Sequence, residues 1–106
     1  MSENAIQKCI LDYLAAQHIL AFRMQTGQAK MGDRFVRFGT PGMADILAFP
    51  RVIFKPNLLV SLPLWIEVKA EKGKQSPLQS SFQEQVEAEG HFYIIARSIE
   101  DVEAAL

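Results

Sequence analysis

Three residues in the middle of the chain could bind a metal ion and hydrolyse a phosphodiester bond. Asp45 opens one short apolar stretch, Glu67 lies inside a second, and Lys69 follows Glu67 by two residues. An ionised carboxylate within an apolar run is unfavourable unless a partner compensates its charge, so Glu67 requires a partner. A hard divalent cation such as Mg²⁺ would relieve the repulsion between two neighbouring carboxylates. The sequence therefore predicts a cation site at Asp45 and Glu67.

Such a cation would lower the pKa of a bound water and neutralise the charge that builds on a phosphate oxygen. A lysine beside it could position the nucleophile or stabilise the transition state. The pattern indicates phosphodiester hydrolysis. The alternative interpretation is structural: Glu67 and Lys69 form a surface salt bridge, and Asp45 is a turn residue after GTPG at 39–42.

The strands that carry these residues decide whether they meet. Residues 67 and 69 of a strand point to the same face, because side chains alternate with period two. We expect a strand at 45–49 to pair with the apolar run at 58–68, since consecutive strands usually lie side by side. The two carboxylates would then converge at one end of the sheet. Pro63 interrupts the second run and indicates an edge position or a bulge where the pairing changes.

The remaining elements follow from hydrophobic periodicity and capping residues. Ser2 can cap an amphipathic helix over 3–16, and residues 19–25 and 34–38 suggest a hairpin. Ser76, Pro77 and Gln79 form a helix start with a capping box, and that helix ends at Gly90. A buried strand at 91–96 and a helix from Ser98 to Leu106 complete the chain.

A strand, helix and strand over 64–96 predict a parallel pair joined by a crossover. The fold class is therefore α/β, with helices flanking a mixed sheet, in the order α-β-β-β-(β)-α-β-α. The 106 residues, with 49% hydrophobic and 22% charged, fit one domain over 1–106. We expect a cytoplasmic protein without a membrane partner, because no apolar run is long enough to span a bilayer and the start lacks a secretory pattern.

Basic residues concentrate in the middle of the chain. Residues 23–74 hold nine Lys or Arg against four acids, whereas the two ends together are acidic, and the formal net charge is −1. A basic face for a polyanion gives such an asymmetry, as do solvated surface lysines.

The stretch RFVRFGTPGMADILAF at 34–49, together with the chain from Trp65 to Leu106, resembles the virus-type replication-repair nuclease domain (VRR-NUC). VRR-NUC is a branch of the PD-(D/E)XK nuclease superfamily. The specific parts are GxxD at 42–45, ExK at 67–69, the glutamine of SPLQ at 79, and EGHFYIIARSIEDV at 89–102. The resemblance implies a restriction-endonuclease-like core. The proline-aspartate pair of the superfamily is absent, since Met43 and Ala44 separate Gly42 from Asp45.

The resemblance also implies roles for individual residues. Asp45 and Glu67 would be the acidic ligands of Mg²⁺ or Mn²⁺, the main-chain carbonyl of Val68 would complete the protein's share, and Lys69 would be the catalytic lysine. Gln79 would be an accessory residue, in addition to its place in the capping box.

Glu3 would be the acid that the superfamily often adds from its first helix. The alternative is that Glu3 only interacts favourably with the helix dipole.

Five basic residues are candidates for DNA binding. Lys72 and Lys74 follow the site in sequence and could meet a neighbouring phosphate, or simply be solvated. Arg34 and Arg37 bracket RFVRF, and Lys30 precedes them in a segment, 26–33, whose role the sequence leaves open. Arg34 and Arg37 cannot both face DNA on a regular strand, because odd and even positions face opposite ways.

The predicted function is a metal-dependent endonuclease acting on DNA, with one Mg²⁺ or Mn²⁺ site per chain and no organic cofactor. The resemblance implies a structure-directed enzyme for Holliday junctions, flaps or other branched DNA in phage or bacterial replication and repair. A homodimer is expected, because the domain is small and branched DNA presents two strands. The alternatives are a non-catalytic DNA-binding or assembly module, and a nuclease for RNA or single strands.

Overall fold

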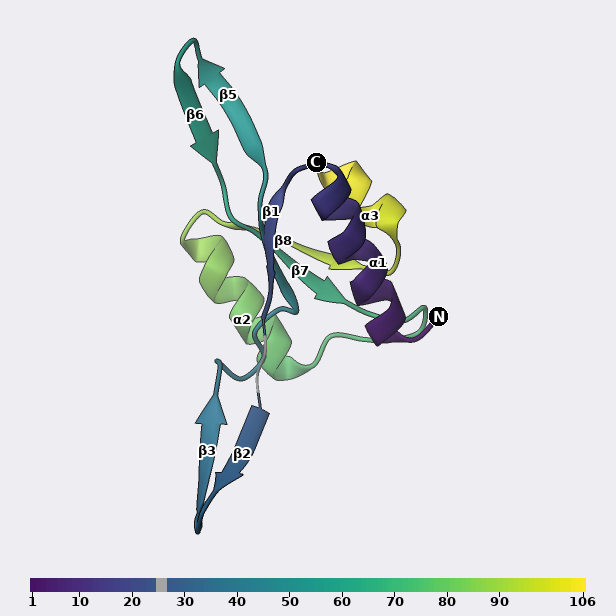
Figure 1. Cartoon of the computed structure of the whole chain (residues 1–106), viewed down its shortest axis with the longest axis vertical. Helices are drawn as coiled ribbons and strands as arrows, with labels where there is room; N and C mark the ends of the chain where they lie inside the picture. The colour runs from purple at the N-terminus through teal and green to yellow at the C-terminus, as the bar shows by residue number, and fades with distance from the viewer. Residues whose placement is uncertain (25–26) are drawn as a thin grey trace.

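The computed structural model describes residues 1–24 and 27–106, without the side chains of residues 27–30, 35–38 and 54. The described residues form three helices: α1 (Glu3–Ala16), α2 (Pro77–Ala88) and α3 (Ile99–Ala105). The strands are β1 (Leu20–Arg23), β2 (Gly27–Met31), β3 (Arg34–Phe38), β4 (Ile46–Phe49), β5 (Arg51–Lys55), β6 (Leu58–Ser61), β7 (Leu64–Val68) and β8 (Phe92–Ala96), as Figure 1 shows.

Four strands form the central sheet in the order β1-β4-β7-β8. The first three are antiparallel, and β7 runs parallel to β8 after the connection through α2. The predicted α/β class with a mixed sheet is therefore confirmed, as is the pairing of the strand after Asp45 with the strand that holds Glu67. Without the two hairpins, the elements follow one another as α-β-β-β-α-β-α.

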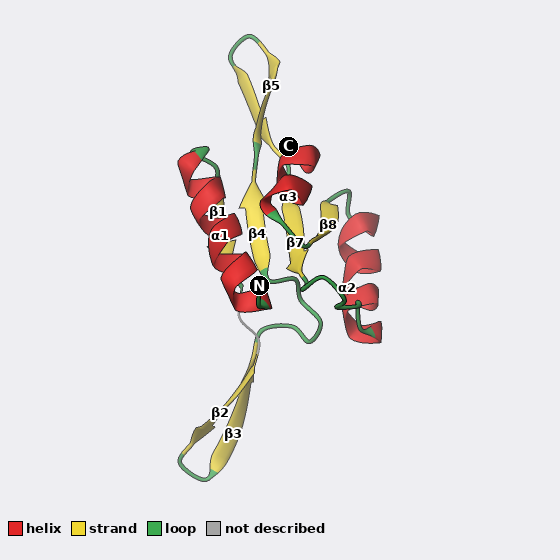
Figure 2. Cartoon of the chain, turned by 90° about the vertical axis from the view of Figure 1, so that its right-hand side faces the viewer, coloured by secondary structure: helices red, strands yellow, loops and turns green. Residues whose placement is uncertain are grey.

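Helices cover both faces of this sheet: α1 and α3 lie on one side and α2 on the other (Figure 2). The side chains of Leu64, Ile66 and Val68 pack with the first pair of helices in the main core. Trp65 packs on the other side against Phe82 of α2, with the ring centroids 5.0 Å apart. Because side chains alternate along a strand, Glu67 belongs to the α2 side of β7.

Two hairpins, β2–β3 and β5–β6, project from opposite ends of the molecule (Figure 1). The radius of gyration is 15.2 Å, above the about 13 Å expected of a compact chain of this length. The extra extent comes from these hairpins, which lie outside the helix-covered sheet.

The predicted hairpin between residues 19–25 and 34–38 is wrong. β1 pairs with β4, and β3 pairs with β2, whose residues GQAKM lack the apolar alternation of a half-buried strand. The two-residue turn at Gly32 and Asp33, with Gly32 at φ 65°, closes this second hairpin. Residues 25–26 lie outside the described part of the chain.

β5 is a strand that the sequence analysis did not predict. It pairs with β6, while β7, directly after Pro63, joins the central sheet. The predicted change of pairing at Pro63 is therefore confirmed. None of the described helices is both long and apolar enough to cross a membrane.

Candidate active site

The antiparallel register of β4 and β7 brings Asp45 and Glu67 to the same end of the sheet. Ile46 pairs with Ile66, so Asp45, one residue before β4, comes opposite Glu67. The Oδ2 atom of Asp45 accepts a hydrogen bond of 2.8 Å from the main-chain N–H of Val68. The main-chain oxygen of Asp45 accepts a second bond, of 2.7 Å, from the N–H of Met24 beyond the end of β1. Asp45 is therefore fixed on both sides.

Glu67 is buried, with 2% of its surface exposed. Its Oε2 atom lies 3.5 Å from the Nζ of Lys69 and accepts a 3.2 Å hydrogen bond from the Nε2 of Gln79. Its Oε1 atom is buried and has no hydrogen-bond partner. A buried carboxylate oxygen normally has a partner, and among the described residues Oε1 of Glu67 is the buried side-chain atom that lacks one.

The pKa of Glu67 is raised from its ordinary value of 4.5 to about 8, and burial is the largest cause. The negative charge of Asp45 contributes to this rise, while the nearby ammonium group of Lys69 opposes it. The two carboxyl groups are therefore close enough to compete for one proton, and the single lysine does not offset their repulsion. A bound cation would remove this competition.

Lys69 is also buried, with 9% of its surface exposed. The Glu67–Lys69 contact of the alternative interpretation therefore exists, but it lies inside the protein and not on its surface. Two buried charges lose more hydration free energy than a surface pair does. A binding or catalytic site that uses both charges would account for this lost hydration free energy better than a purely structural contact would.

Gln79 joins the start of α2 to Glu67. Its Oε1 accepts a 2.9 Å hydrogen bond from the N–H of Ser76, which closes the capping box, and its Nε2 donates to Glu67. One side chain therefore both closes the capping box and contacts Glu67. Gly42 lies directly against this turn at φ 80°, and a Cβ there would collide with the main chain of Leu78 and Gln79.

Asp45, Glu67 and Lys69 line a polar pocket of about 180 Å³ that extends to the first turns of α1. Its lining consists of Glu3, Asn4, Gln7, Asp45, Glu67, Val68, Lys69 and Gln79. Glu3 therefore lies at the pocket. Among the described residues, however, no three His, Cys, Asp or Glu side chains gather as a metal-binding group.

Asn4 and Gln7 were missed by the sequence analysis. Gln7 is 7% exposed, and its Oε1 accepts a 3.1 Å hydrogen bond from the Nη2 of Arg23. The sequence did contain a sign of this role, because Gln7 lies beside Ile6 and one turn before Ile10, on the face that α1 buries. A polar residue on a buried helical face requires a partner.

The oxygen donors of this pocket suit a hard divalent cation. The available donors are carboxylate oxygens, one of them unsatisfied, beside a main-chain carbonyl at Val68. Oxygen donors of this kind suit Mg²⁺ and Mn²⁺, and Mg²⁺ keeps several waters, so it does not need a third acidic side chain.

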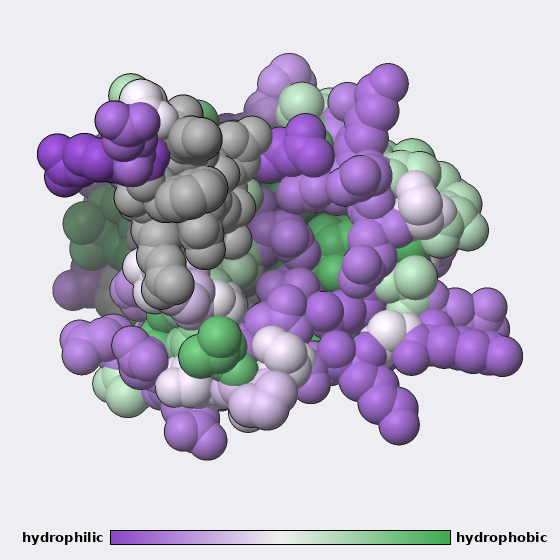
Figure 3. Space-filling model, turned by 90° about the horizontal axis from the view of Figure 1, so that it is seen from below, coloured by the Kyte–Doolittle hydropathy of each residue, from purple (hydrophilic) through white to green (hydrophobic). Residues whose placement is uncertain are grey.

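The candidate DNA-binding residues fall in two places. Lys72 and Lys74 are exposed directly after Lys69, and Arg34 is exposed at the start of β3. The side chains of Lys30 and Arg37 lie outside the described ones. The β2–β3 hairpin leaves and rejoins the body within a few residues of Met24 and Asp45, and hydrophilic side chains cover most of the described surface at this end (Figure 3).

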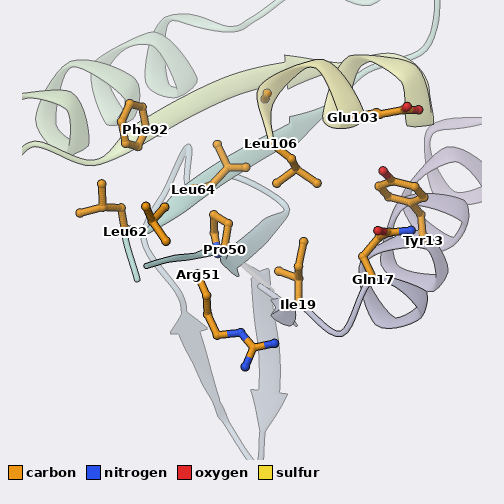
Figure 4. Close-up of a pocket in the computed structure, with 12 residues that line it drawn as sticks. Tyr13, Gln17, Ile19, Pro50, Arg51, Leu62, Leu64, Phe92, Glu103 and Leu106 are labelled. Atoms are coloured by element: carbon orange, nitrogen blue, oxygen red, sulfur yellow. The ribbon is translucent and has the colours of Figure 1, made fainter. Parts of the chain in front are cut away.

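A larger hollow, of about 570 Å³, lies at the other end of the sheet (Figure 4). Apolar side chains such as Leu62, Leu64 and Phe92 dominate it, with Arg51 and Glu103 also in its lining. It contains no member of the acidic pocket.

Comparisons of the chain with protein-family models, with curated proteins and with solved structures found no match.

Proposed function

We propose that this chain is a metal-dependent nuclease that hydrolyses DNA phosphodiester bonds. The observation that carries the proposal is the state of Glu67: a buried carboxylate beside Asp45, paired with a buried lysine, whose Oε1 has no partner. Packed apolar residues often stabilise a fold as well as such a buried pair does. A metal-dependent site for phosphodiester cleavage would use both the carboxylates and the lysine.

Asp45, Glu67 and the carbonyl of Val68 would hold Mg²⁺ or Mn²⁺. When bound, the ion would acidify a water and offset the charge on the phosphate. Gln79 and Lys69 both contact Oε2 of Glu67, which leaves Oε1 for the ion. Lys69 holds its ammonium group beside the carboxylates, where it can orient the attacking water or stabilise the developing negative charge. Glu3, which also lines the pocket, would be the additional acid from the first helix.

The fold supports a restriction-endonuclease-like core of the VRR-NUC type. The central elements follow as α-β-β-β-α-β-α, and the acidic pocket lies where β4 begins and β7 ends. The motif spacing of GxxD and ExK provides the second support.

The proposed substrate is branched or otherwise structured DNA, bound by a homodimer. Lys72, Lys74 and Arg34 are exposed at the site end and can contact phosphates. Lys30 and Arg37 would add charge along the β2–β3 hairpin. The proposed homodimer would act on this DNA during replication or repair.

The test is cleavage of labelled Holliday-junction, flap and linear DNA by the purified protein, with Mg²⁺, Mn²⁺ or EDTA. We expect cleavage with either metal, none with EDTA, and none with Glu67→Gln or Lys69→Met, which keep the side-chain volume. Glu84→Gln, which removes an acid on the exposed side of α2, is the matched control and should cleave normally.

DNA binding that needs no metal and is not followed by cleavage would instead support the alternative of a non-catalytic DNA-binding module. Cleavage that persists in Glu67→Gln would refute the assigned centre.

A further inference from the structure

The segment between β7 and α2 is held by Arg97. The Nη2 of Arg97 donates a 2.7 Å hydrogen bond to the carbonyl of Gly73, and its Nε donates a 3.3 Å bond to the carbonyl of Glu71. The main-chain N–H of Arg97 donates in turn to Oδ2 of Asp101 at 2.8 Å. Arg97 is thus fixed to the start of α3 while its guanidinium group binds two carbonyls of the segment.

This segment packs against the stem of Lys69. The N–H of Gly73 donates a 2.9 Å bond to the carbonyl of Ala70, which folds residues 70–73 into a turn. A Cβ placed on Gly73 would lie 3.3 Å from the Cδ of Lys69 and 3.4 Å from its Cβ. The main chain at Gly73 is therefore a wall beside the aliphatic part of Lys69.

The far end of the segment is anchored separately. Gln75 donates through Nε2 to the hydroxyl of Tyr93 at 3.1 Å and to Oε1 of Gln83 at 2.8 Å. Arg97 therefore restrains the part of the segment that contacts Lys69, and Gln75 restrains the part that precedes α2.

We propose that Arg97 is a positioning residue for Lys69 in the proposed nuclease reaction. By holding Gly73 in place, Arg97 keeps the wall against the lysine stem and so keeps the Nζ of Lys69 at the Oε2 of Glu67. A guanidinium group suits the task because its planar fork can donate to two carbonyls in fixed directions, which an ammonium group cannot. This inference rests on the proposed function.

The test compares Arg97→Ala, Arg97→Lys and Gly73→Ala with the unmodified protein. Kinetics of DNA cleavage give kcat and KM, and acylation of lysines, followed by mass spectrometry, gives the accessibility of Lys69. Lys8, on the exposed side of α1, serves as the internal reference for acylation, and Lys8→Ala is the control for loss of one positive charge.

We expect Arg97→Ala to lower kcat about tenfold, as expected for a displaced catalytic group, with KM changed less than about twofold. Lys69 should become several times more reactive toward acylation relative to Lys8. Arg97→Lys should restore only part of kcat. Gly73→Ala keeps Arg97 but crowds Lys69, so it should also lower kcat.

Two results would overturn the inference. A raised KM with unchanged kcat, fully restored by Arg97→Lys, would mean that Arg97 only attracts DNA. Unchanged reactivity of Lys69 in Arg97→Ala would mean that Arg97 does not control the lysine. Since acylation does not depend on cleavage, an inactive protein would refute the proposed function but still decide whether Arg97 positions Lys69.

Discussion

Asp45 and Glu67 lie opposite each other at the end of the β4–β7 pair, and Asp45 is held there by the N–H of Val68 at 2.8 Å. The carboxylate that comes from the loop is thus oriented by the strand that carries the other one. Because this bond ties the Asp45 carboxylate to the residue directly after Glu67, the separation of the two acids depends little on the rest of the loop after β3.

The first prediction concerns the pH dependence of stability without metal. The pKa of Glu67 is about 8 in the folded protein against an ordinary value of 4.5. A group with a raised folded-state pKa contributes stability below its unfolded pKa and loses it as pH rises through the folded value. In EDTA, the free energy of unfolding should therefore fall between about pH 4.5 and pH 8, by on the order of a few kcal/mol.

Urea denaturation at several pH values measures this effect. Glu67→Gln should flatten the profile, whereas Glu84→Gln should leave it unchanged. A profile of the unmodified protein that is flat over this interval would contradict the raised pKa.

The second prediction concerns metal binding. Mg²⁺ or Mn²⁺ should raise the melting temperature more at pH 8 than at pH 6, because the ion requires deprotonated carboxylates. At a hundredfold excess over its Kd, a ligand stabilises the folded state by about 2.7 kcal/mol. Thermal melts with metal or EDTA measure the shift, which should disappear in Asp45→Asn and persist in Glu84→Gln. An equal shift in all these proteins would place the ion elsewhere.

The third prediction concerns Gly42. Gly42→Ala introduces a Cβ that collides with the main chain at the start of α2, in addition to the strain of φ 80°. Gly90→Ala has a similar φ of 83° but meets nothing within 4 Å, so it isolates the strain, on the order of 1–3 kcal/mol. Chemical denaturation should show a clearly larger loss for Gly42→Ala. Equal losses of unfolding free energy in the two variants would mean that the loop around Gly42 moves away from α2 without cost.

The fourth prediction concerns Lys72 and Lys74. If both contact phosphates, their joint replacement by alanine should weaken DNA binding and reduce the slope of log Kd against log salt by about 1 to 2. Filter binding at several salt concentrations, in EDTA to prevent cleavage, measures this slope. Replacement of Lys8 and Lys55, which are exposed on α1 and β5, is the matched control. An unchanged slope would mean that the two lysines are only solvated.

The residues that belong to regular alternation and capping were predictable from the sequence. The bounds of α1 and α2 follow from Ser2 and Ser76, and the convergence of Asp45 with Glu67 follows from the pairing of consecutive strands. The pairing of β1 was not predictable in the same way. β1 pairs with β4, so two strands and the loop after them separate partners that a local pattern would not connect.

The sequence also did not reveal the contacts that depend on tertiary structure. Gln7 and Arg23 meet because α1 crosses beside β1, and Arg97 reaches Gly73 only because β7 and β8 are parallel neighbours. Such contacts join residues that no fixed sequence spacing relates. Each side chain alone had an ordinary explanation as a helical or surface residue.

Gln79 uses both ends of its amide, one to begin α2 and the other to hold Glu67. Rotation of that amide by half a turn would break both bonds at once, so the group has a single useful orientation. Fraying of the first helical turn would consequently release the glutamate before the rest of the protein unfolds. The proposed nuclease activity should therefore be lost on heating at a lower temperature than the secondary structure.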